Sequence, residues 1–363
     1  MIYIHVPFCH RKCTYCAFFS KVESGKWKVE SYVDALIEEM RLRCHEQNHP
    51  IRTIYFGGGT PSILPLGELE RIVKALHECF DLSQVEEVTL EANPEDLTVG
   101  YLQGLSDLGF VDRLSIGIQS LDDAMLRLIG RRHTADQALA AVENAHAVGF
   151  SNLSVDFIYG LPETFQFSAF NFQLVSHVSA YALTVEPGTA LAVQVEQGRV
   201  VLPDEEEVIQ QYYTLRQQLL RAGFRQYEVS NYARPGFESK HNSRYWDRTP
   251  YLGLGPGAHS FSLFDGGSTS VAHVEKRRWN KPDGTFEQEI LTEADAYNEL
   301  LMTALRTTRG LALAQVPKKY KERLHCGMQP YVDLDWIVLK DNCFVPTPEG
   351  LLHADGMAAA LFV

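Results

Sequence analysis

The amino-acid sequence predicts an α/β protein, with an incomplete (β/α)6 barrel and a smaller C-terminal helical or winged-helix-like domain. Over roughly the first 225 residues, short runs of β-branched and aromatic residues alternate with longer amphipathic stretches. This alternation is typical of strand-helix units that build a parallel sheet. Six such units indicate an incomplete barrel rather than a closed (β/α)8 barrel. Beyond them the composition changes, which predicts a boundary.

The expected barrel elements follow one another along the chain. The candidate strands span residues 2–6, 52–57, 87–92, 112–119, 152–160 and 178–186. Helical spacing of apolar residues is clearest between them and after the last strand, in residues 29–47, 67–80, 134–150 and 203–224. In barrels of this kind the chemistry gathers where strands end and loops begin. We therefore expect the functional residues at those strand ends.

Three regions are expected, at 1–225, 226–288 and 289–363. Residues 226–288 are rich in Gly, Pro and aromatic residues, and turn formers dominate this connecting segment. A helix is expected over 293–308, and residues 335–352 have the pattern of a hairpin followed by a final helix. These elements predict the small C-terminal domain.

Composition excludes several classes of protein. The chain has 363 residues, 45% of them hydrophobic, and can bury a large core. Its 33 Lys and Arg against 46 Asp and Glu give a net charge of −13, which argues against nucleic acid as a main partner. No apolar stretch approaches the roughly 20 residues of a membrane span, and the start lacks the layout of a signal peptide. We therefore expect a cytoplasmic protein whose cysteines are thiols or metal ligands.

Three of the seven cysteines cluster directly behind the first strand. Cys9, Cys13 and Cys16 have the spacing CxxxCxxC. Three thiolates in one short loop can hold three corners of a 4Fe-4S cluster, and with no fourth cysteine nearby one iron stays open for an outside ligand. A zinc site completed by His5 or His10, or unrelated buried thiols, are the alternatives on spacing alone.

Several short sequence motifs resemble those of one known family. "YIHVPFCHRKCTYC", "YFGGGTPS", "TLEANPEDL", "LSIGIQS" and "VDFIYGLP" are similar to the radical S-adenosylmethionine (SAM) superfamily. Within it they resemble the branch that contains oxygen-independent coproporphyrinogen III dehydrogenase and heme chaperones. The resemblance implies a 4Fe-4S cluster on the three cysteines. It also implies SAM on the open iron, cleaved to a 5'-deoxyadenosyl radical by an electron from a low-potential donor such as flavodoxin or ferredoxin.

The resemblance also implies residues that hold SAM. The family pattern places Gly58, Gly59 and Thr60 against its amino group and methionine part. Residues at the positions of Tyr3 and Glu91 meet the first SAM in the dehydrogenase branch, and those at Gln119, Arg131 and Asp156 meet a second molecule. Read without the family, each polar residue is as readily a salt bridge or a helix cap.

Three features separate the chaperone branch from the dehydrogenase branch. The dehydrogenase pattern has a further cysteine where this chain has Phe18, and an N-terminal extension where the cluster loop here begins almost at Met1. "HNSRYW", residues 241–246, resembles the HNxxYW heme-binding signature of the chaperone branch. His241 could ligate heme iron with Tyr245 and Trp246 against the porphyrin, or all three could be core residues.

The function expected from the sequence is therefore that of a heme chaperone. Such a protein binds heme as cargo and transfers it to heme-acceptor proteins, for instance in a respiratory complex, with the cluster and SAM supporting the transfer. The first alternative is oxidative decarboxylation of coproporphyrinogen III. A radical enzyme acting on another substrate is the second alternative.

Overall fold

A nine-stranded sheet forms the centre of the protein. The computed structural model describes residues 1–22, 28–47, 49–162, 170–265, 273–281 and 283–363. Six strands lie side by side in chain order and pair in parallel, which confirms the predicted strand series. They are β1 (Ile2–Val6), β4 (Thr53–Gly58), β5 (Glu87–Ala92), β6 (Arg113–Gln119), β7 (Asn152–Tyr159) and β8 (His177–Ala182).

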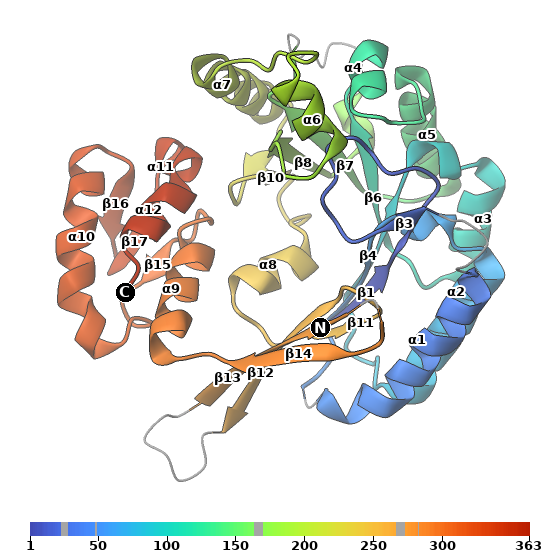
Figure 1. Cartoon of the computed structure of the whole chain (residues 1–363), viewed down its shortest axis with the longest axis horizontal. Coiled ribbons are helices and arrows are strands. Elements are labelled where there is room, and N and C mark those ends of the chain that lie inside the picture. Colours follow the sequence, from blue (N-terminus) through green and yellow to red (C-terminus); the bar gives the residue numbers. More distant parts are fainter. Residues whose placement is uncertain (23–27, 48, 163–169, 266–272, 282) are drawn as a thin grey trace.

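Helices cover the outer face of this sheet (Figure 1). They are α1 (Val29–Arg43), α2 (Leu66–Cys79), α3 (Val99–Leu108), α4 (Asp123–Leu128), α5 (Ala135–Val148), α6 (Ala190–Glu196) and α7 (Glu205–Arg221). Local sequence sets their ends. Thr134 closes a capping box with Gln137 at the start of α5, and Gly149, with φ of +116°, ends that helix. The six parallel strands share one large apolar core with α1, α2, α3, α5 and α7, whereas α4 and α6 contribute no described residue to it.

Residues 226–288 do more than connect two domains, because they supply strands to both edges of the sheet. At one edge, β10 (Asn231–Ala233) pairs antiparallel with β8, and β9 (Arg225–Gln226) pairs antiparallel with β10. At the other edge, β11 (Leu252–Leu254) pairs in parallel with β1. The helix α8 (Lys240–Trp246) lies between these strands in the sequence. A separate antiparallel sheet follows, made of β12 (His259–Asp265), β13 (His273–Asn280) and β14 (Phe286–Ile290).

The C-terminal residues form a smaller unit with its own apolar core. It contains α9 (Glu293–Ala304), β15 (Leu311–Ala312), α10 (Lys321–Asp333), β16 (Ile337–Lys340), β17 (Cys343–Pro346), α11 (Pro348–Leu352) and α12 (Ala354–Ala360). The β16–β17 hairpin and the helices after it match the predicted hairpin and final helix. Figure 1 shows this unit beside the barrel.

Short elements complete the chain. β2 (Phe8–Cys9) pairs with β3 (Lys21–Val22), and short 3-10 helices connect the larger elements in the part of the chain that the structure describes. These are η1 (Cys44–Glu46), η2 (Pro61–Ile63), η3 (Pro94–Asp96), η4 (Phe172–Leu174) and η5 (Lys318–Tyr320). Across the described ranges, none of the helices combines the length and the apolarity that a membrane span requires.

Candidate functional site

The carboxyl ends of the parallel strands surround a cavity of about 450 Å³. Side chains or backbone from five neighbouring strands line it: Gly58 of β4, Glu91 of β5, Gly117 and Gln119 of β6, Asp156 of β7 and Tyr181 of β8. The cysteine loop that follows β1 forms another wall. Of the twelve site residues predicted from the sequence, ten line this one cavity, whereas Tyr3 and His241 do not.

Cys9, Cys13 and Cys16 are free thiols, half-buried, and all three line the cavity. The loop that carries them is held from behind. The backbone N–H and the hydroxyl of Thr14 donate to the carbonyls of Ile129 and Leu128, each at 3.0 Å. Gly130 lies against the same residue, where a Cβ would approach Thr14 to 3.2 Å. The end of α4 therefore fixes the loop that presents the thiols.

His5 does not complete a single-metal site with the three thiols in this structure. Within the described part of the chain, no group of three or more His, Cys, Asp or Glu side chains converges on one metal position. His5 is not free to complete a zinc site, because its Nε2 is hydrogen-bonded to the Phe19 carbonyl at 2.9 Å and its Nδ1 to Tyr3 at 3.1 Å. Burial, together with Cys13 and Cys9 nearby, raises the pKa of the Cys16 thiol. Iron ligation would stabilise the thiolate form against this effect.

Close packing explains why glycine occupies the turn after β4. Gly58 has φ of +111°, and a Cβ there would lie 2.7 Å from the His5 ring. At Gly59 a Cβ would lie 2.5 Å from the Phe8 carbonyl oxygen. These contacts bring the turn against the cysteine loop, where the Thr60 hydroxyl approaches Cys9 Sγ at 3.5 Å. The glycines are therefore needed for the protein's own packing as well as for ligand approach.

Glu91 is the most perturbed carboxyl group of the cavity. It accepts hydrogen bonds from the Tyr55 hydroxyl at 2.7 Å and from the Gly58 N–H at 3.1 Å. Burial, and to a smaller extent the nearby Asp156, raise its pKa to about 7 against the opposing effect of those hydrogen bonds. A cation or a hydroxyl group placed above Glu91 would find an acceptor whose position is already fixed.

Arg131 lies across the opposite wall. Its Nη2 donates to the Asn93 side-chain oxygen and to the Gly117 carbonyl, both at 2.6 Å, and its Nη1 lies 3.7 Å from Cys13 Sγ. Its buried Nε has no hydrogen-bond partner in the described structure. A buried N–H without a partner is costly, so Arg131 is held here at an energetic cost while its Nη atoms anchor the wall of the cavity.

Gln119 and Asp156 complete the polar rim. Gln119 has φ of +71°, which is unusual for a residue other than glycine, and lies where the pairing of β6 with β7 shifts in register. Asp156 accepts a hydrogen bond from the Ser115 hydroxyl at 3.3 Å, and burial raises its pKa. Gln119 is the last residue of β6, as the sequence predicted, whereas β7 continues three residues beyond Asp156, to Tyr159; both residues line the cavity.

Tyr3 lies beneath the cavity rather than in its wall. Its ring stacks on Tyr55 with centroids 6.1 Å apart, and a Cβ on Gly57 would approach the two rings to 3.0 and 2.8 Å. Tyr3 therefore supports the glycine turn from below. Contact between Tyr3 and a ligand, as the family pattern implies, stays a prediction.

His241 lies away from this cavity, near the opposite ends of the strands. Its side chain is fully buried, with Nδ1 hydrogen-bonded to the Thr53 hydroxyl at 2.9 Å and Nε2 to the Tyr245 hydroxyl at 3.1 Å. Burial lowers its pKa to about 3. An axial heme ligand needs a free ring nitrogen. In this conformation both nitrogens are occupied, so ligation by His241 would require α8 to open, and that prediction is untested.

Sequence reasoning missed several residues that shape the cavity. Asn93 joins two of its walls, since its amide donates to Thr60 at 3.3 Å and its oxygen accepts from Arg131. Tyr55, Ser115 and Tyr181 point into the barrel from β4, β6 and β8, on the same strand faces as Gly57, Gly117 and Ser179. These residues could have been found from the sequence, because side chains two positions apart on a strand point to the same face, and the predicted site residues already marked the inner face of each strand.

The cavity brings three thiols together with a carboxylate, a guanidinium group and a glycine turn. These groups fit an iron-sulfur cluster with a small polar cofactor beside it. Such a site at the strand ends of this barrel is that of a radical SAM protein. The family model "Radical SAM superfamily" matches residues 3–167. Membership of that superfamily implies binding of a 4Fe-4S cluster and SAM.

Within that superfamily the chain belongs to the family of the heme chaperone HemW. It is 35% identical to the "Heme chaperone HemW" of Lactococcus lactis over 327 residues, which cover 88% of this chain and 84% of that protein. The HemW of Synechocystis is 32% identical over 99% of this chain and 95% of its own length. The Bos taurus "Radical S-adenosyl methionine domain-containing protein 1, mitochondrial" is 37% identical over 85% of this chain and 74% of its length.

One solved structure shares the whole fold. Coproporphyrinogen III oxidase (HemN) from Escherichia coli superposes with a TM-score of 0.80, covering 100% of this chain and 89% of that one. The sequence identity is 21%, so this likeness concerns the fold.

Proposed function

We propose that this protein is a heme chaperone, which binds heme and transfers it to a heme-dependent acceptor protein. The observation that carries the proposal is the near full-length relationship to proteins named heme chaperone HemW. A second observation supports it. Phe18, at the position of a further cysteine in the dehydrogenase pattern, is 73% exposed beside the cavity. An aromatic ring there cannot replace a thiol.

In this proposal the cavity holds the cluster and SAM. Cys9, Cys13 and Cys16 would hold the cluster. When bound, the cluster and SAM together supply one-electron chemistry at the sulfonium group. The protein's contribution is orientation: Glu91 accepts from the amino group or the ribose, and the turn at Gly58, Gly59 and Thr60 brings bare backbone close to the methionine part, with Tyr3 beneath it.

Arg131, Gln119 and Asp156 form the wall for a further polar ligand, which we assign to a second SAM molecule. The Nε of Arg131 has no partner among the described residues, and Asp156 is a buried carboxyl group that is hydrogen-bonded by Ser115 and Ser179. Arg131 and Asp156 have opposite charges, which suit the carboxylate and the ammonium group of one methionine moiety.

The remaining partners follow from the same proposal. A low-potential donor such as flavodoxin or ferredoxin would reduce the cluster, and acceptor proteins of a respiratory chain would take the heme. We propose a cytoplasmic location, and His241 remains the heme ligand proposed from the motif, in a conformation with α8 opened.

An anoxic reconstitution tests the proposal. Iron and sulfide are quantified in the purified protein, its paramagnetic resonance is recorded with and without SAM, and hemin is then titrated by absorbance. We expect about four irons per chain from the cluster type, a signal that SAM changes, and saturable hemin binding.

The same preparation decides between the two functions. Incubation with coproporphyrinogen III, SAM and a reductant should yield no porphyrin above background. Porphyrin formation without saturable hemin binding would assign the protein to the decarboxylating alternative.

A further inference from the structure

The strands β4 and β5 each reach from α8 to the cavity at the cysteine loop, which we call the cluster cavity. At their first residues, the Thr53 hydroxyl is hydrogen-bonded to His241 Nδ1 at 2.9 Å, and the Glu87 carboxylate accepts the His241 backbone N–H at 2.9 Å. Toward their other ends, Gly58 and Glu91 line the cluster cavity. The proposed heme ligand and the proposed SAM site therefore lie at the two ends of the same pair of strands.

Tyr55 occupies the space between these two ends. It follows Thr53 on the inner face of β4, because side chains two positions apart on a strand share a face, and it is buried. Its hydroxyl donates to Glu91 at 2.7 Å, and its ring meets the His241 ring with centroids 5.0 Å apart. One side chain thus touches both the acceptor proposed for SAM and the histidine proposed for heme.

The position of His241 decides how firmly Tyr55 is held. In the closed conformation the His241 ring is fixed by Thr53 and Tyr245 and packs against the Tyr55 ring. When His241 leaves to ligate iron, the Tyr55 ring loses this contact, and a close-packed interior does not close such a gap fully. The Tyr55 hydroxyl then holds Glu91 less firmly. A ligand on Glu91 is therefore bound best while α8 is closed, because its acceptor is then preorganised.

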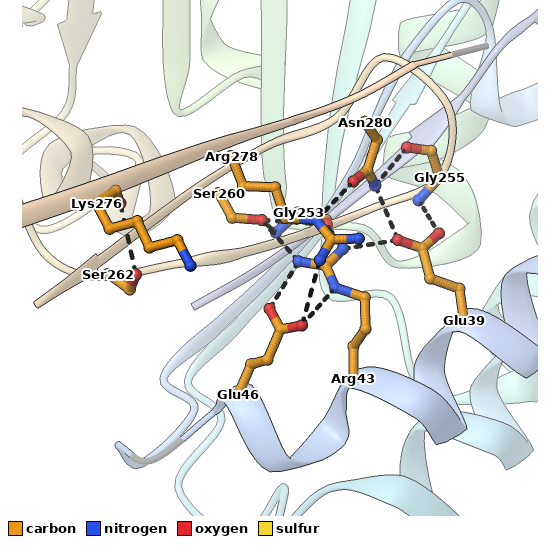
Figure 2. A network of polar contacts seen from close by, with 10 residues as sticks. All are labelled: Glu39, Arg43, Glu46, Gly253, Gly255, Ser260, Ser262, Lys276, Arg278 and Asn280. Carbon is orange, nitrogen blue, oxygen red and sulfur yellow. Dashed lines mark hydrogen bonds and ion pairs between the residues drawn. The ribbon is translucent and has the colours of Figure 1, made fainter. Parts of the chain in front are cut away.

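The chain on both sides of α8 is anchored, so that an opening of α8 can stay local. Before α8, β10 pairs with β8, and after it β11 pairs with β1. Arg43 donates to the Gly253 carbonyl in β11 at 2.8 Å, and Figure 2 shows this arginine held in turn by Glu39 and Glu46. The movement can thus be taken up by residues 234–251, without disturbing the strands that carry Tyr55 and Glu91.

We propose that Tyr55 couples the SAM site to the heme ligand, so that bound SAM favours the closed α8 and weakens heme binding. The inference rests on the proposed heme-chaperone function and adds its regulation. By linkage, a ligand that binds best to the closed conformation shifts the protein toward that conformation. Heme is then taken up without SAM, and SAM binding promotes its release to an acceptor protein.

Two titrations of the full-length, reconstituted protein test the coupling. The cluster is kept oxidised under anoxic conditions, so that SAM binds without being cleaved. Hemin is titrated by absorbance with and without saturating SAM, and SAM affinity is measured by equilibrium dialysis with and without hemin. In the wild type we expect SAM to weaken hemin binding by about fivefold or more, and hemin to weaken SAM binding by the same factor.

Tyr55→Phe is the decisive variant, because it keeps the ring against His241 and removes only the bond to Glu91. Without that bond SAM no longer distinguishes the two conformations, so the coupling factor should fall to about one. Tyr101→Phe is the matched control. It removes a hydroxyl of α3 that donates to the Leu64 carbonyl at 3.3 Å, and it should keep the factor of the wild type.

Thr53→Val biases the same equilibrium without changing Tyr55 or Glu91. It removes the hydroxyl bonded to His241 and so destabilises the closed conformation. We expect hemin to bind about fivefold more tightly without SAM, as for one lost hydrogen bond, while SAM still weakens hemin binding. The iron content of every variant is measured first. Should Tyr55→Phe fail to load its cluster, Thr53→Val decides, and unchanged or weaker hemin binding there would refute the coupling.

The outcomes separate the coupling from the function. Saturable hemin binding that SAM leaves unchanged or strengthens in the wild type would overturn the coupling and leave the chaperone function standing. A coupling factor that persists in Tyr55→Phe, or is lost equally in Tyr101→Phe, would show that Tyr55 does not carry it. Failure of the wild type to bind hemin would overturn the function itself.

Discussion

The backbone N–H of Gly58 donates a hydrogen bond of 3.1 Å to the carboxylate of Glu91, so the glycine turn after β4 is tied to the carboxyl end of β5. This bond links the two motifs that the family pattern assigns to SAM. It also orients a carboxyl group that is buried next to Asp156 and whose pKa is raised to about 7.

Glu91 should make the stability of the cluster-free protein depend on pH. Its pKa of about 7 in the folded protein lies above the ordinary value of 4.5 for a glutamate. The stabilisation is therefore present below pH 4.5 and is lost as the pH rises through 7, by roughly 3 kcal/mol. Urea unfolding at several pH values checks this against Glu91→Gln, whose curve should lack that loss. Parallel pH profiles for the two proteins would contradict the prediction.

Substitution of Gly59 should disrupt the cluster loop. In Gly59→Ala the new Cβ would lie 2.5 Å from the Phe8 carbonyl oxygen, so the turn or the loop must move. We expect a loss of about 1–3 kcal/mol of stability and less iron after reconstitution. Gly67→Ala is the matched control, because nothing lies within 4 Å of its Cβ in α2, and it should be neutral or slightly stabilising. Equal iron contents in the two variants would argue against the packing described here.

Asn93 should matter for SAM but not for the cluster. Asn93→Ala removes the acceptor of Arg131 Nη2 and the donor to Thr60, which leaves both side chains less well positioned. We expect SAM affinity, measured by equilibrium dialysis, to fall about tenfold, which corresponds to about 1.4 kcal/mol for lost hydrogen bonds, while the iron content is unchanged. Gln103→Ala, which removes an exposed amide from α3, serves as control. Unchanged SAM affinity in Asn93→Ala would remove this residue from the site.

His241 should behave as a structural residue in the closed conformation. His241→Ala leaves Thr53 and Tyr245 without their shared partner and opens a cavity behind Tyr55, so we expect a loss of about 2–4 kcal/mol. Its pKa of about 3 in the folded protein lies below the ordinary value of 6.5 for a histidine. Its contribution is therefore full above pH 6.5 and is lost as the pH falls toward 3. Thermal unfolding with His146→Ala as control checks both; equal stability of the two variants would refute the structural role.

Much of the barrel could be predicted because each of its strands has a local sequence pattern of β-branched and aromatic residues. Runs such as residues 87–92 and 152–160 give strands at β5 and β7 within one residue of the expected bounds. The small strands β10 and β11 could not be predicted, since three-residue strands have no periodicity to detect. Their place in the sheet depends on partners far away in the sequence.

The site residues also divide into those that could be predicted from the sequence and those that could not. Cysteine spacing and strand-end position indicated Cys9, Cys13, Cys16, Glu91 and Asp156, because covalent spacing and parallel topology bring those groups together. His241 could not be placed from its motif, since the same letters fit a buried, hydrogen-bonded core and an open heme ligand. Burial depends on α8 packing against β4, which no local pattern reports.

The pairing of β1 with β11 has a consequence for biosynthesis. The first strand of the chain is completed on one side by β4 and on the other by residues 252–254, which emerge from the ribosome some two hundred and fifty positions later. Until then the strand that anchors the metal-binding loop has an open flank, and contacts of such long sequence separation form late in folding. Iron-sulfur loading of a stably enclosed centre therefore follows translation of most of the polypeptide.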